Sequence, residues 1–377
     1  MGMDTFDKLK LLSNASQYDL ACACGTRGGT DHRVRGKDGG WLYPVSLPSG
    51  GYSIMLKTLI SNVCVNDCAY CPFRAARDVP RCTITPHEMA KLFIEFQSRE
   101  KLIGMFLSSG VVGSPDGTMA LLNGTAEILR RKYAYRGYIH LKIIPGASDA
   151  AIEHAVSLAS AVSVNIEVPG EKHFTILSQQ KDYIKDIIHP MRHIARITGK
   201  GMKHSHVRQT TQFIVGAADE KDAEVIKYTY ELYKRLNLNR VYFSAYQRGL
   251  GSEKIPGEQR ETMNPEDGFV REHRLYQVDF LFRQYGFCVE DITFDENGSL
   301  FIDRDPKLVW AENHPEKFPV DVNKADKNTL LRVPGVGPTT ARRILEMRKN
   351  GGRISVDTLP MKGKQLALAE KYLKYGR

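Results

Sequence analysis

Hydrophobic and polar positions follow two alternating periodicities between residue 52 and about residue 300. Six apolar runs have the length of a strand, and each is followed by a longer amphipathic or polar stretch. In stretches such as TPHEMAKLFIEFQ and EKDAEVIKYTYELYKRL the apolar positions recur at three and four residues, which predicts helices with one buried face. The expected strands cover residues 53–60, 101–108, 137–144, 161–168, 209–216 and 239–246.

Repeated strand–helix units predict a parallel sheet with right-handed connections and a covering of helices. Six units suit an incomplete barrel better than the eightfold one. The expected fold class is therefore α/β, with a (βα)6 partial TIM barrel over residues 51–302. Residues 1–50 are rich in Gly and polar residues and predict a loop-rich N-terminal extension. Residues 303–321 hold three prolines and predict a linker to a small all-α domain over residues 322–377.

The chain has seven cysteines, and three of them lie in CVNDCAYC, directly after the first expected strand. Clustered cysteines in a reducing compartment indicate metal before disulfide. Thiolates at Cys64, Cys68 and Cys71 suit three corners of a [4Fe–4S] cubane, with one iron left for an exogenous ligand. Structural zinc prefers four protein ligands, usually from C-x2-C pairs. The C-x3-C-x2-C spacing thus favours a cluster, and zinc or buried structural thiols are the alternatives.

This motif after the first strand of a partial barrel, with Tyr70 between the last two cysteines, resembles the radical SAM superfamily. The resemblance implies that S-adenosylmethionine chelates the fourth iron and is cleaved reductively to a 5′-deoxyadenosyl radical. It also implies an electron donor such as flavodoxin or ferredoxin. Tyr70 would contact the adenine. Where the family places a Gly-Gly-Glu-like segment for the methionyl amine, this chain has Ser108, Ser109 and Gly110, which keeps small residues but loses the acid.

The same resemblance suggests further contacts to S-adenosylmethionine at the ends of the later strands. Asn165 and Glu167 are candidates for the ribose hydroxyls, and alternation along the expected strand puts both on one face. Gln212 would reach the methionyl carboxylate, while Gly216 and Tyr246 would lie against the adenine. Packing within the barrel is the alternative for each of these residues.

The remaining cysteines have several interpretations. Cys22, Cys24 and Cys82 would ligate an auxiliary cluster, supply a hydrogen atom, or lie buried as small apolar residues. Cys288 is expected in the core. The chain lacks an apolar leader near its start and any apolar run of about 18–20 residues, so we expect a cytoplasmic protein without a membrane span.

The C-terminal end carries most of the positive charge. From residue 320 onward there are 13 Lys and Arg against five Asp and Glu, which is +8 of the total net charge of +10. The segment VDVNKADKNTLLRVPGVGPTTARRILEMRKNGG resembles the helix-hairpin-helix family, and a weaker copy follows with Met361–Lys364 at its hairpin. The resemblance implies backbone contacts to nucleic acid, with a protein-docking helical pair as the alternative. The candidate contact residues are Gly335, Val336, Gly337, Thr339, Arg342 and Arg343.

Together the two segments resemble a bacterial family of radical SAM proteins described as DNA modification or repair proteins, with a uracil-DNA-glycosylase-like partner. The leading hypothesis is radical modification or repair of DNA, on a flipped or single-stranded nucleotide. Loops over residues 25–37 and 247–260 would form the entrance. RNA modification, for example of a tRNA base, is a second hypothesis. A non-catalytic DNA-binding protein with a redox-sensing cluster is a third. The sequence leaves the substrate atom, the hydrogen donor and the fate of the cofactor open.

Overall fold

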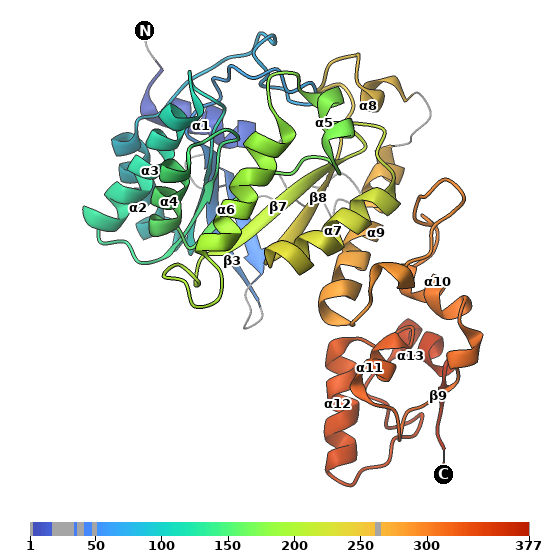
Figure 1. Ribbon diagram of the computed structural model, residues 1–377. Coiled ribbons are helices and arrows are strands. Elements are labelled where there is room, and N and C mark those ends of the chain that lie inside the picture. Colours follow the sequence, from blue (N-terminus) through green and yellow to red (C-terminus); the bar gives the residue numbers. More distant parts are fainter. Residues whose placement is uncertain (1–2, 17–33, 36–40, 47–50, 261–264, 377) are drawn as a thin grey trace. The chain divides into compact units, whose positions relative to one another are not determined.

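The computed structural model describes residues 3–16, 34–35, 41–46, 51–260 and 265–376. The chain divides into two compact units (Figure 1). The first, called here the barrel unit, comprises Met1–Glu220 and Glu231–Phe269. The second, called the C-terminal unit, comprises Lys221–Tyr230 and Val270–Arg377. The second unit thus starts earlier along the chain than the linker expected at residues 303–321.

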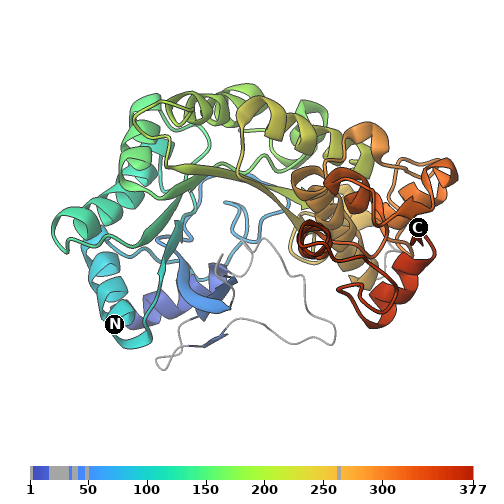
Figure 2. The same cartoon turned by 90° about the horizontal axis from the view of Figure 1, so that it is seen from below.

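An eight-stranded sheet in the order β1 to β8 forms the centre of the barrel unit. Its last six strands pair in parallel, each with the next along the chain. These are β3 (Tyr52–Leu59), β4 (Gly104–Ser108), β5 (Tyr138–Lys142), β6 (Ala161–Ser163), β7 (Arg208–Val215) and β8 (Arg240–Ala245). All six expected strands are present, and the sheet is open and curled (Figure 2). The (βα)6 partial barrel is therefore confirmed.

Helices cover the outer side of the curled sheet, where Figure 2 shows them from cyan to yellow. Burial alternates along β8, with Val241, Phe243 and Ala245 buried and the residues between them half-buried. This alternation gives the sheet one face for the helices and a second, more polar face. The connecting helices are α2 (Pro86–Glu100), α3 (Pro115–Arg131), α4 (Asp149–Leu158), α5 (Glu171–Leu177), the π-helix η2 (Tyr183–Ile188), α6 (His189–Ile197) and α7 (Asp222–Leu236).

The connecting helices start at side-chain caps that their sequences supply. Thr85 and Glu88 form a reciprocal capping box at α2, followed by Pro86 in the first turn. Ser114 and Ser148 accept a hydrogen bond from a first-turn N–H of α3 and α4 in the same way. These caps satisfy backbone donors that a helix start leaves without an intrahelical partner, so the strand-to-helix turns are set locally.

The N-terminal extension is more ordered than the sequence led us to expect. Helix α1 (Thr5–Ala15) buries Leu9 and Leu12, and the Ser16 hydroxyl donates to the carbonyl of Lys57 on β3. Strands β1 (Val34–Arg35) and β2 (Trp41–Ser46) add antiparallel pairs beside β3. The prediction of a loop-rich segment was wrong for these residues, because the glycines after residue 24 outweighed the short apolar pattern before them.

The C-terminal unit is mainly helical. Its helices are α9 (Pro265–Gln284), which begins in the barrel unit, α10 (Pro306–Glu312), α11 (Lys327–Arg332), α12 (Pro338–Lys349) and α13 (Gly363–Glu370). Two short 3-10 turns, η3 (Val289–Asp291) and η4 (Pro315–Lys317), accompany them. One parallel pair, β9 (Val320–Asp321) with β10 (Leu373–Lys374), departs from the expected all-α composition. In the barrel unit, the short α8 (Pro256–Gln259) follows β8.

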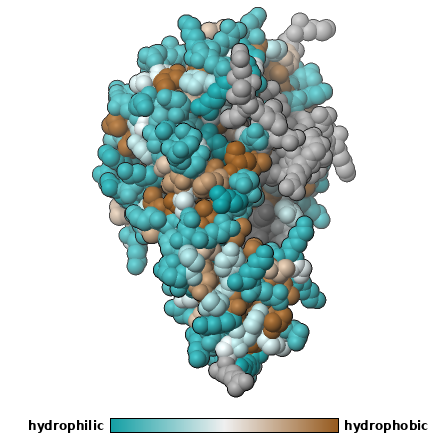
Figure 3. Space-filling view, turned by 90° about the vertical axis from the view of Figure 1, so that its right-hand side faces the viewer, coloured by the Kyte–Doolittle hydropathy of each residue, from teal (hydrophilic) through white to brown (hydrophobic). Residues whose placement is uncertain are grey.

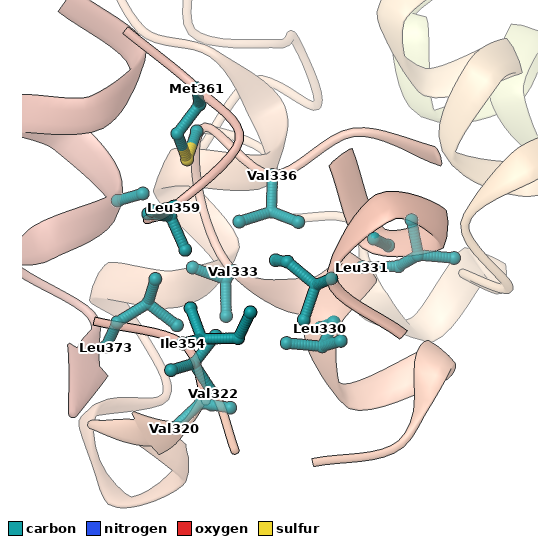
Figure 4. Close-up of a cluster of buried hydrophobic side chains, with 13 residues drawn as sticks. Val320, Val322, Leu330, Leu331, Val333, Val336, Ile354, Leu359, Met361 and Leu373 are labelled. Atoms are coloured by element: carbon teal, nitrogen blue, oxygen red, sulfur yellow. The ribbon is translucent and has the colours of Figure 1, made fainter. Parts of the chain in front are cut away.

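A separate apolar core holds the last 58 residues together (Figure 4). Leu330 and Leu331 of α11, Val336 of the following turn and Ile344 of α12 are all nearly inaccessible to solvent. Leu373 reaches the same cluster from the end of the chain. An apolar core is thus present in the segment for which the sequence predicted a small domain, and the compact unit that contains this core starts earlier in the chain. Within the expected linker, Trp310 of α10 is also buried.

No helix in the described part of the chain is long and apolar enough to cross a membrane. Figure 3 shows one face of the molecule, on which hydrophilic residues cover most of the coloured surface and hydrophobic ones form small groups.

Candidate functional site

The cysteine motif lies in a loop at the carboxyl end of β3, beside the end of β4. The Val65 N–H donates to the Val111 carbonyl at 3.0 Å, and the Gly110 N–H donates to the Ser61 carbonyl at 2.7 Å. A Cβ at Gly110 would come within 2.4 Å of the Val63 oxygen. The segment 108–110 therefore lies directly against the loop, and only glycine fits at its third position.

The three thiols of the motif influence one another electrostatically. Burial raises the pKa of Cys71 to about 12, and the charges of Cys68 and Cys64 add to this effect. Burial also raises the pKa of Cys68, against a lowering by Lys181. In a metal-free protein the thiols of Cys68 and Cys71 stay protonated at neutral pH. A bound cation would supply the positive charge that makes them thiolates.

The arrangement of the three cysteines distinguishes between the two kinds of metal site that the sequence left open. Within the described residues, no three His, Cys, Asp or Glu side chains are gathered tightly enough for a single metal ion. Thiolates around a cubane each bind a different iron, so they stand at separate corners rather than around one point. Cys68 is buried, Cys64 and Cys71 are half-buried, and all three belong to one loop. This arrangement fits three corners of a cubane.

Glu167 is brought to the cysteine loop by an unusual backbone conformation. The expected strand 161–168 ends at Ser163, and Glu167 has a φ of 64°, in the left-handed region. Its N–H donates to the Gln212 carbonyl at 3.0 Å. Burial first, and then the charge of Glu167, hold the pKa of Tyr70 well above its usual range, and the two side chains share a hydrogen bond. Tyr70 and Glu167 therefore lie in one cluster of side chains with the thiols of Cys68 and Cys71.

Asn165 has a different neighbour from Glu167. The Lys142 ammonium on β5 donates to the Asn165 Oδ1 at 2.5 Å, and both residues are buried. The alternation that would put Asn165 and Glu167 on one strand face does not apply, because β6 ends before either of them. On the same polar side of the sheet, His140 contacts the Ser163 hydroxyl at 2.9 Å. The Gln212 side chain is buried on β7.

Gly216 and Tyr246 lie at the ends of β7 and β8. Gly216 has a φ of 93° and donates its N–H to Glu220. The Tyr246 hydroxyl donates to Glu258, and a Cβ at Gly257 would come within 2.6 Å of the Tyr246 ring. Tyr246 therefore packs under the loop over residues 247–260.

The loop over residues 247–260 is hydrogen-bonded to the cysteine loop. The Arg74 guanidinium donates to the carbonyls of Cys71 and Leu250, each at 3.0 Å. The Ser252 N–H donates to the Ala69 carbonyl at 2.7 Å. Sequence analysis placed this loop at the barrel entrance but missed Arg74. Its position three residues after the last cysteine of the motif was the available signal.

Residues 177–181, at the end of α5 and just after it, are hydrogen-bonded to the cysteine loop as well. The Ser178 hydroxyl donates to Asp67 Oδ1 at 2.6 Å, and the Gln179 N–H donates to Asp67 Oδ2 at 2.8 Å. The Lys181 ammonium donates to the Cys68 sulfur at 2.9 Å. Sequence analysis missed both Asp67 and Lys181, which are 114 positions apart and meet only in the tertiary structure.

The other cysteines contact different groups. The Cys82 thiol faces the Lys8 carbonyl of α1 at 3.8 Å. The Cys288 thiol, in the C-terminal unit, lies 3.2 Å from Asp291 and is half-buried, whereas the sequence predicted a core position. Cys22, Cys24 and most of the loop over residues 25–37 lie outside the described residues.

The hairpin between α11 and α12 has the geometry that its glycines allow. Gly335 has a φ of 84°, and a Cβ there would come within 2.7 Å of the Gln365 carbonyl of α13. Helix α12 starts at Gly337 without a side-chain cap. Its first-turn N–H groups therefore lack the side-chain acceptor that α2, α3 and α4 possess.

Val336 serves the core of this domain rather than its surface. Its side chain is buried, its N–H donates to the Val333 carbonyl at 3.1 Å, and its carbonyl accepts from the Lys307 ammonium at 2.6 Å. The sequence included Val336 among the nucleic-acid contacts, and the structure gives it no group that faces outward. In the weaker second copy, Met361 is buried and Lys362 precedes α13.

Two grooves with basic linings flank α12. One, of about 430 Å³, is lined by Lys327, Thr339, Arg342 and Lys349 together with Glu346 and apolar residues. The other, of about 640 Å³, lies toward the end of the helix, and its basic residues are Lys324, Arg348, Lys349 and Arg353. Thr339 and Arg342 of the predicted contact set thus line a groove, and Arg343 is exposed on the same helix.

Comparison with known proteins identifies the C-terminal motif. Residues 316–359 match the family described as helix-hairpin-helix motif, which suggests nucleic-acid binding. No functionally curated protein is significantly similar to the chain in sequence.

Several solved structures are similar to the chain. Methylornithine synthase (PylB) shares 13% identity with a TM-score of 0.46, over 60% of this chain and 62% of that one. The FeFe-hydrogenase maturase HydG from Carboxydothermus hydrogenoformans shares 13% identity with a TM-score of 0.46, over 84% and 81%. SuiB of Streptococcus suis shares 9% identity with a TM-score of 0.45, over 62% and 48%. The chain thus matches less than two thirds of the length of PylB. These likenesses leave the function of the chain open.

Proposed function

We propose that this protein is a radical SAM enzyme whose Cys64, Cys68 and Cys71 hold a [4Fe–4S] cluster. The observation that supports this most directly is one loop at the carboxyl end of a parallel half-barrel that carries all three thiols, of which Cys68 is buried and Cys64 and Cys71 are half-buried. In barrels of this kind the carboxyl ends of the strands carry the reactive site. With S-adenosylmethionine on its fourth iron, the cluster would supply the electron that cleaves the cofactor to a 5′-deoxyadenosyl radical.

The chain's own residues would bind and orient S-adenosylmethionine. Backbone groups of Ser108, Ser109 and Gly110, held against the cysteine loop, suit the methionyl amine. Glu167, fixed by its hydrogen bond to Tyr70, suits the ribose hydroxyls. Asn165, which accepts a hydrogen bond from Lys142, is the second candidate for the ribose hydroxyls. Gln212, Gly216 and Tyr246 complete the proposed surroundings of the cofactor.

We further propose that the substrate is a nucleic acid, and DNA rather than RNA. The helix-hairpin-helix match, the charge of +8 after residue 319 and the basic linings of the two α12 grooves support a nucleic acid. The choice of DNA follows the resemblance to DNA modification or repair proteins. Such a module binds the phosphate backbone and contributes affinity without reading bases. The target nucleotide would enter the barrel flipped or from a single strand. A flavodoxin or ferredoxin in the cytoplasm would supply electrons, and a uracil-DNA-glycosylase-like protein is the proposed partner.

The cluster assignment is tested by replacing one ligand and one matched cysteine. Reconstituted Cys68→Ala should lose the [4Fe–4S] absorbance and the production of 5′-deoxyadenosine, whereas Cys82→Ala should keep both. Iron and sulfide content and product chromatography are the measurements. Retention of the cluster and of cleavage by Cys68→Ala would overturn the proposal.

The substrate class is tested by binding and by product analysis. Competition among duplex DNA, single-stranded DNA and tRNA should favour DNA, with affinity that falls steeply as salt rises. The double variant Arg342→Ala/Lys349→Ala should reduce the slope of log affinity against log salt concentration by about two. Lys185→Ala, on an exposed position of the barrel, should leave this slope unchanged. Mass spectrometry of nucleosides after incubation with reduced enzyme and deuterium-labelled cofactor then identifies the product. Preference for tRNA, or a modified RNA nucleoside, would sink the DNA assignment.

A further inference from the structure

Lys181 lies against the cysteine loop through a segment that is itself fixed to the loop. The Ala69 N–H donates to the Leu177 carbonyl at 2.7 Å, and Asp67 accepts from Ser178 and Gln179 at 2.6 and 2.8 Å. Three hydrogen bonds thus precede the contact of Lys181 in a stretch of five residues. After Lys181, the Asp182 N–H donates to Asp186 Oδ2 at 2.9 Å. The backbone on both sides of Lys181 is thus held by hydrogen bonds, so the fold places this lysine beside the cysteine loop.

The Lys181 ammonium donates to the Cys68 sulfur over 2.9 Å, and Cys68 is the buried member of the three cysteines. A lysine side chain has an ordinary pKa of about 10.4, so this ammonium brings a positive charge to the sulfur at neutral pH.

Charges and hydrogen bonds at ligand sulfurs are two of the factors that set the reduction potential of an iron–sulfur cluster. Reduction adds one electron, and therefore one negative charge, to a site that already holds three thiolates and lies near the Glu167 carboxylate. A fixed positive charge beside one thiolate stabilises the reduced form more than the oxidised form. The electron itself would come from a one-electron donor of the flavodoxin or ferredoxin class.

We propose that Lys181 is a positioning residue of the cluster site, which raises the reduction potential of the cluster through its hydrogen bond and charge at Cys68. This inference rests on the proposed cluster. It assigns a role to a residue that lies outside the cysteine motif and belongs to the segment after α5.

The test compares midpoint potentials of reconstituted proteins, followed by electron paramagnetic resonance of the reduced cluster. Lys181→Met should bind as much iron as the wild type. At a fixed potential its ratio of reduced to oxidised cluster should be about tenfold lower than in the wild type, which corresponds to a midpoint potential about 59 mV lower for a one-electron couple. Lys181→Arg should restore most of the difference. Lys185→Met, an exposed lysine four residues later, should have the wild-type potential.

Lys181→Gln covers the case in which the methionine variant fails to assemble a cluster, because it keeps a hydrogen-bond donor and removes only the charge. It should also have a lower potential than the wild type. An unchanged potential in either cluster-containing variant would refute the role of Lys181. Absence of a [4Fe–4S] cluster in the wild-type protein would instead refute the proposed function, so the two failures are distinguishable.

Discussion

Single residues in the barrel unit show how closely the cysteine loop is packed. Gly110 leaves no space for a side chain, because a Cβ would meet the Val63 carbonyl oxygen at 2.4 Å and the Cys64 Cβ at 3.1 Å. Both atoms belong to the cysteine loop, so one of them would have to move. The position of Cys64 thus depends on the absence of a side chain 46 positions later.

Gly110→Ala should therefore destabilise the fold by about 1–3 kcal/mol, as overpacking does, and should reduce iron binding. Gly124→Ala, inside α3, is the matched control. Its Cβ would lie 3.6 Å from the Pro86 side chain of α2, which is an ordinary van der Waals contact. That variant should be more stable by up to about 1 kcal/mol, because alanine favours a helix over glycine. Urea unfolding and iron content measure both effects. Equal stability of the two variants would contradict the packing argument.

At the scale of elements, the local signals placed the helix starts well and one strand end poorly. The Thr85 cap, the proline after it and Glu88 predict the start of α2 as it is found. The expected strand 161–168 stops at Ser163, and beyond it the Ile166 N–H donates to the Thr211 side-chain hydroxyl of β7 at 3.0 Å instead of to a backbone carbonyl of that strand. A side chain on β7 therefore takes the place of a backbone partner beyond β6, and no local pattern contains that information.

The capping box at α2 makes a pH-dependent contribution. The Thr85 backbone N–H lowers the pKa of Glu88 from its usual range. Stability from this carboxylate is thus present above the unfolded pKa of about 4.3 and is lost as the pH falls through the lower folded value. Glu88→Ala should cost about 1 kcal/mol or less at neutral pH, since the half-buried carboxylate is screened by solvent, and the cost should vanish in acid.

Glu95→Ala, later in the same helix, is the control for this experiment. Glu95 pairs only loosely with Lys91, at 4.0 Å, and has no part in the cap. At neutral pH, Glu95→Ala should lower the free energy of unfolding by less than Glu88→Ala does. Urea unfolding followed across acid and neutral pH decides the matter, and a Glu88→Ala cost that persists in acid would exclude the carboxylate as its source.

At the scale of the whole molecule, long-range contacts join segments that the sequence kept apart. The expected linker contains α10, whose Lys307 is buried and donates to the Val336 carbonyl of the hairpin at 2.6 Å. Burial lowers the pKa of Lys307 to about 7. An unfolded lysine has a pKa of about 10.4, so between these values the unfolded chain binds more protons than the folded one.

Stability of the C-terminal unit should therefore rise as the pH increases from about 7 toward 10. Lys307→Met removes the titrating group and should flatten this rise, whereas Lys317→Met, on an exposed position of η4, should preserve it. Urea unfolding at several pH values provides the measurement. A pH profile of Lys307→Met that matches the wild type would show that Lys307 does not titrate in this range.

The sequence by itself determined the six strand–helix units, the position of the cysteine triad after the first of them, and the helix-hairpin-helix at the end. Each depends on neighbouring residues, through periodicity, spacing or turn chemistry. The tertiary structure alone decided which distant groups meet the triad. Gly110 follows β4, whereas Glu167 and Lys181 both lie in the segment between β6 and β7. They converge on the triad because parallel strands end at one edge of the sheet. That convergence is a property of strand order and register, which no local pattern records.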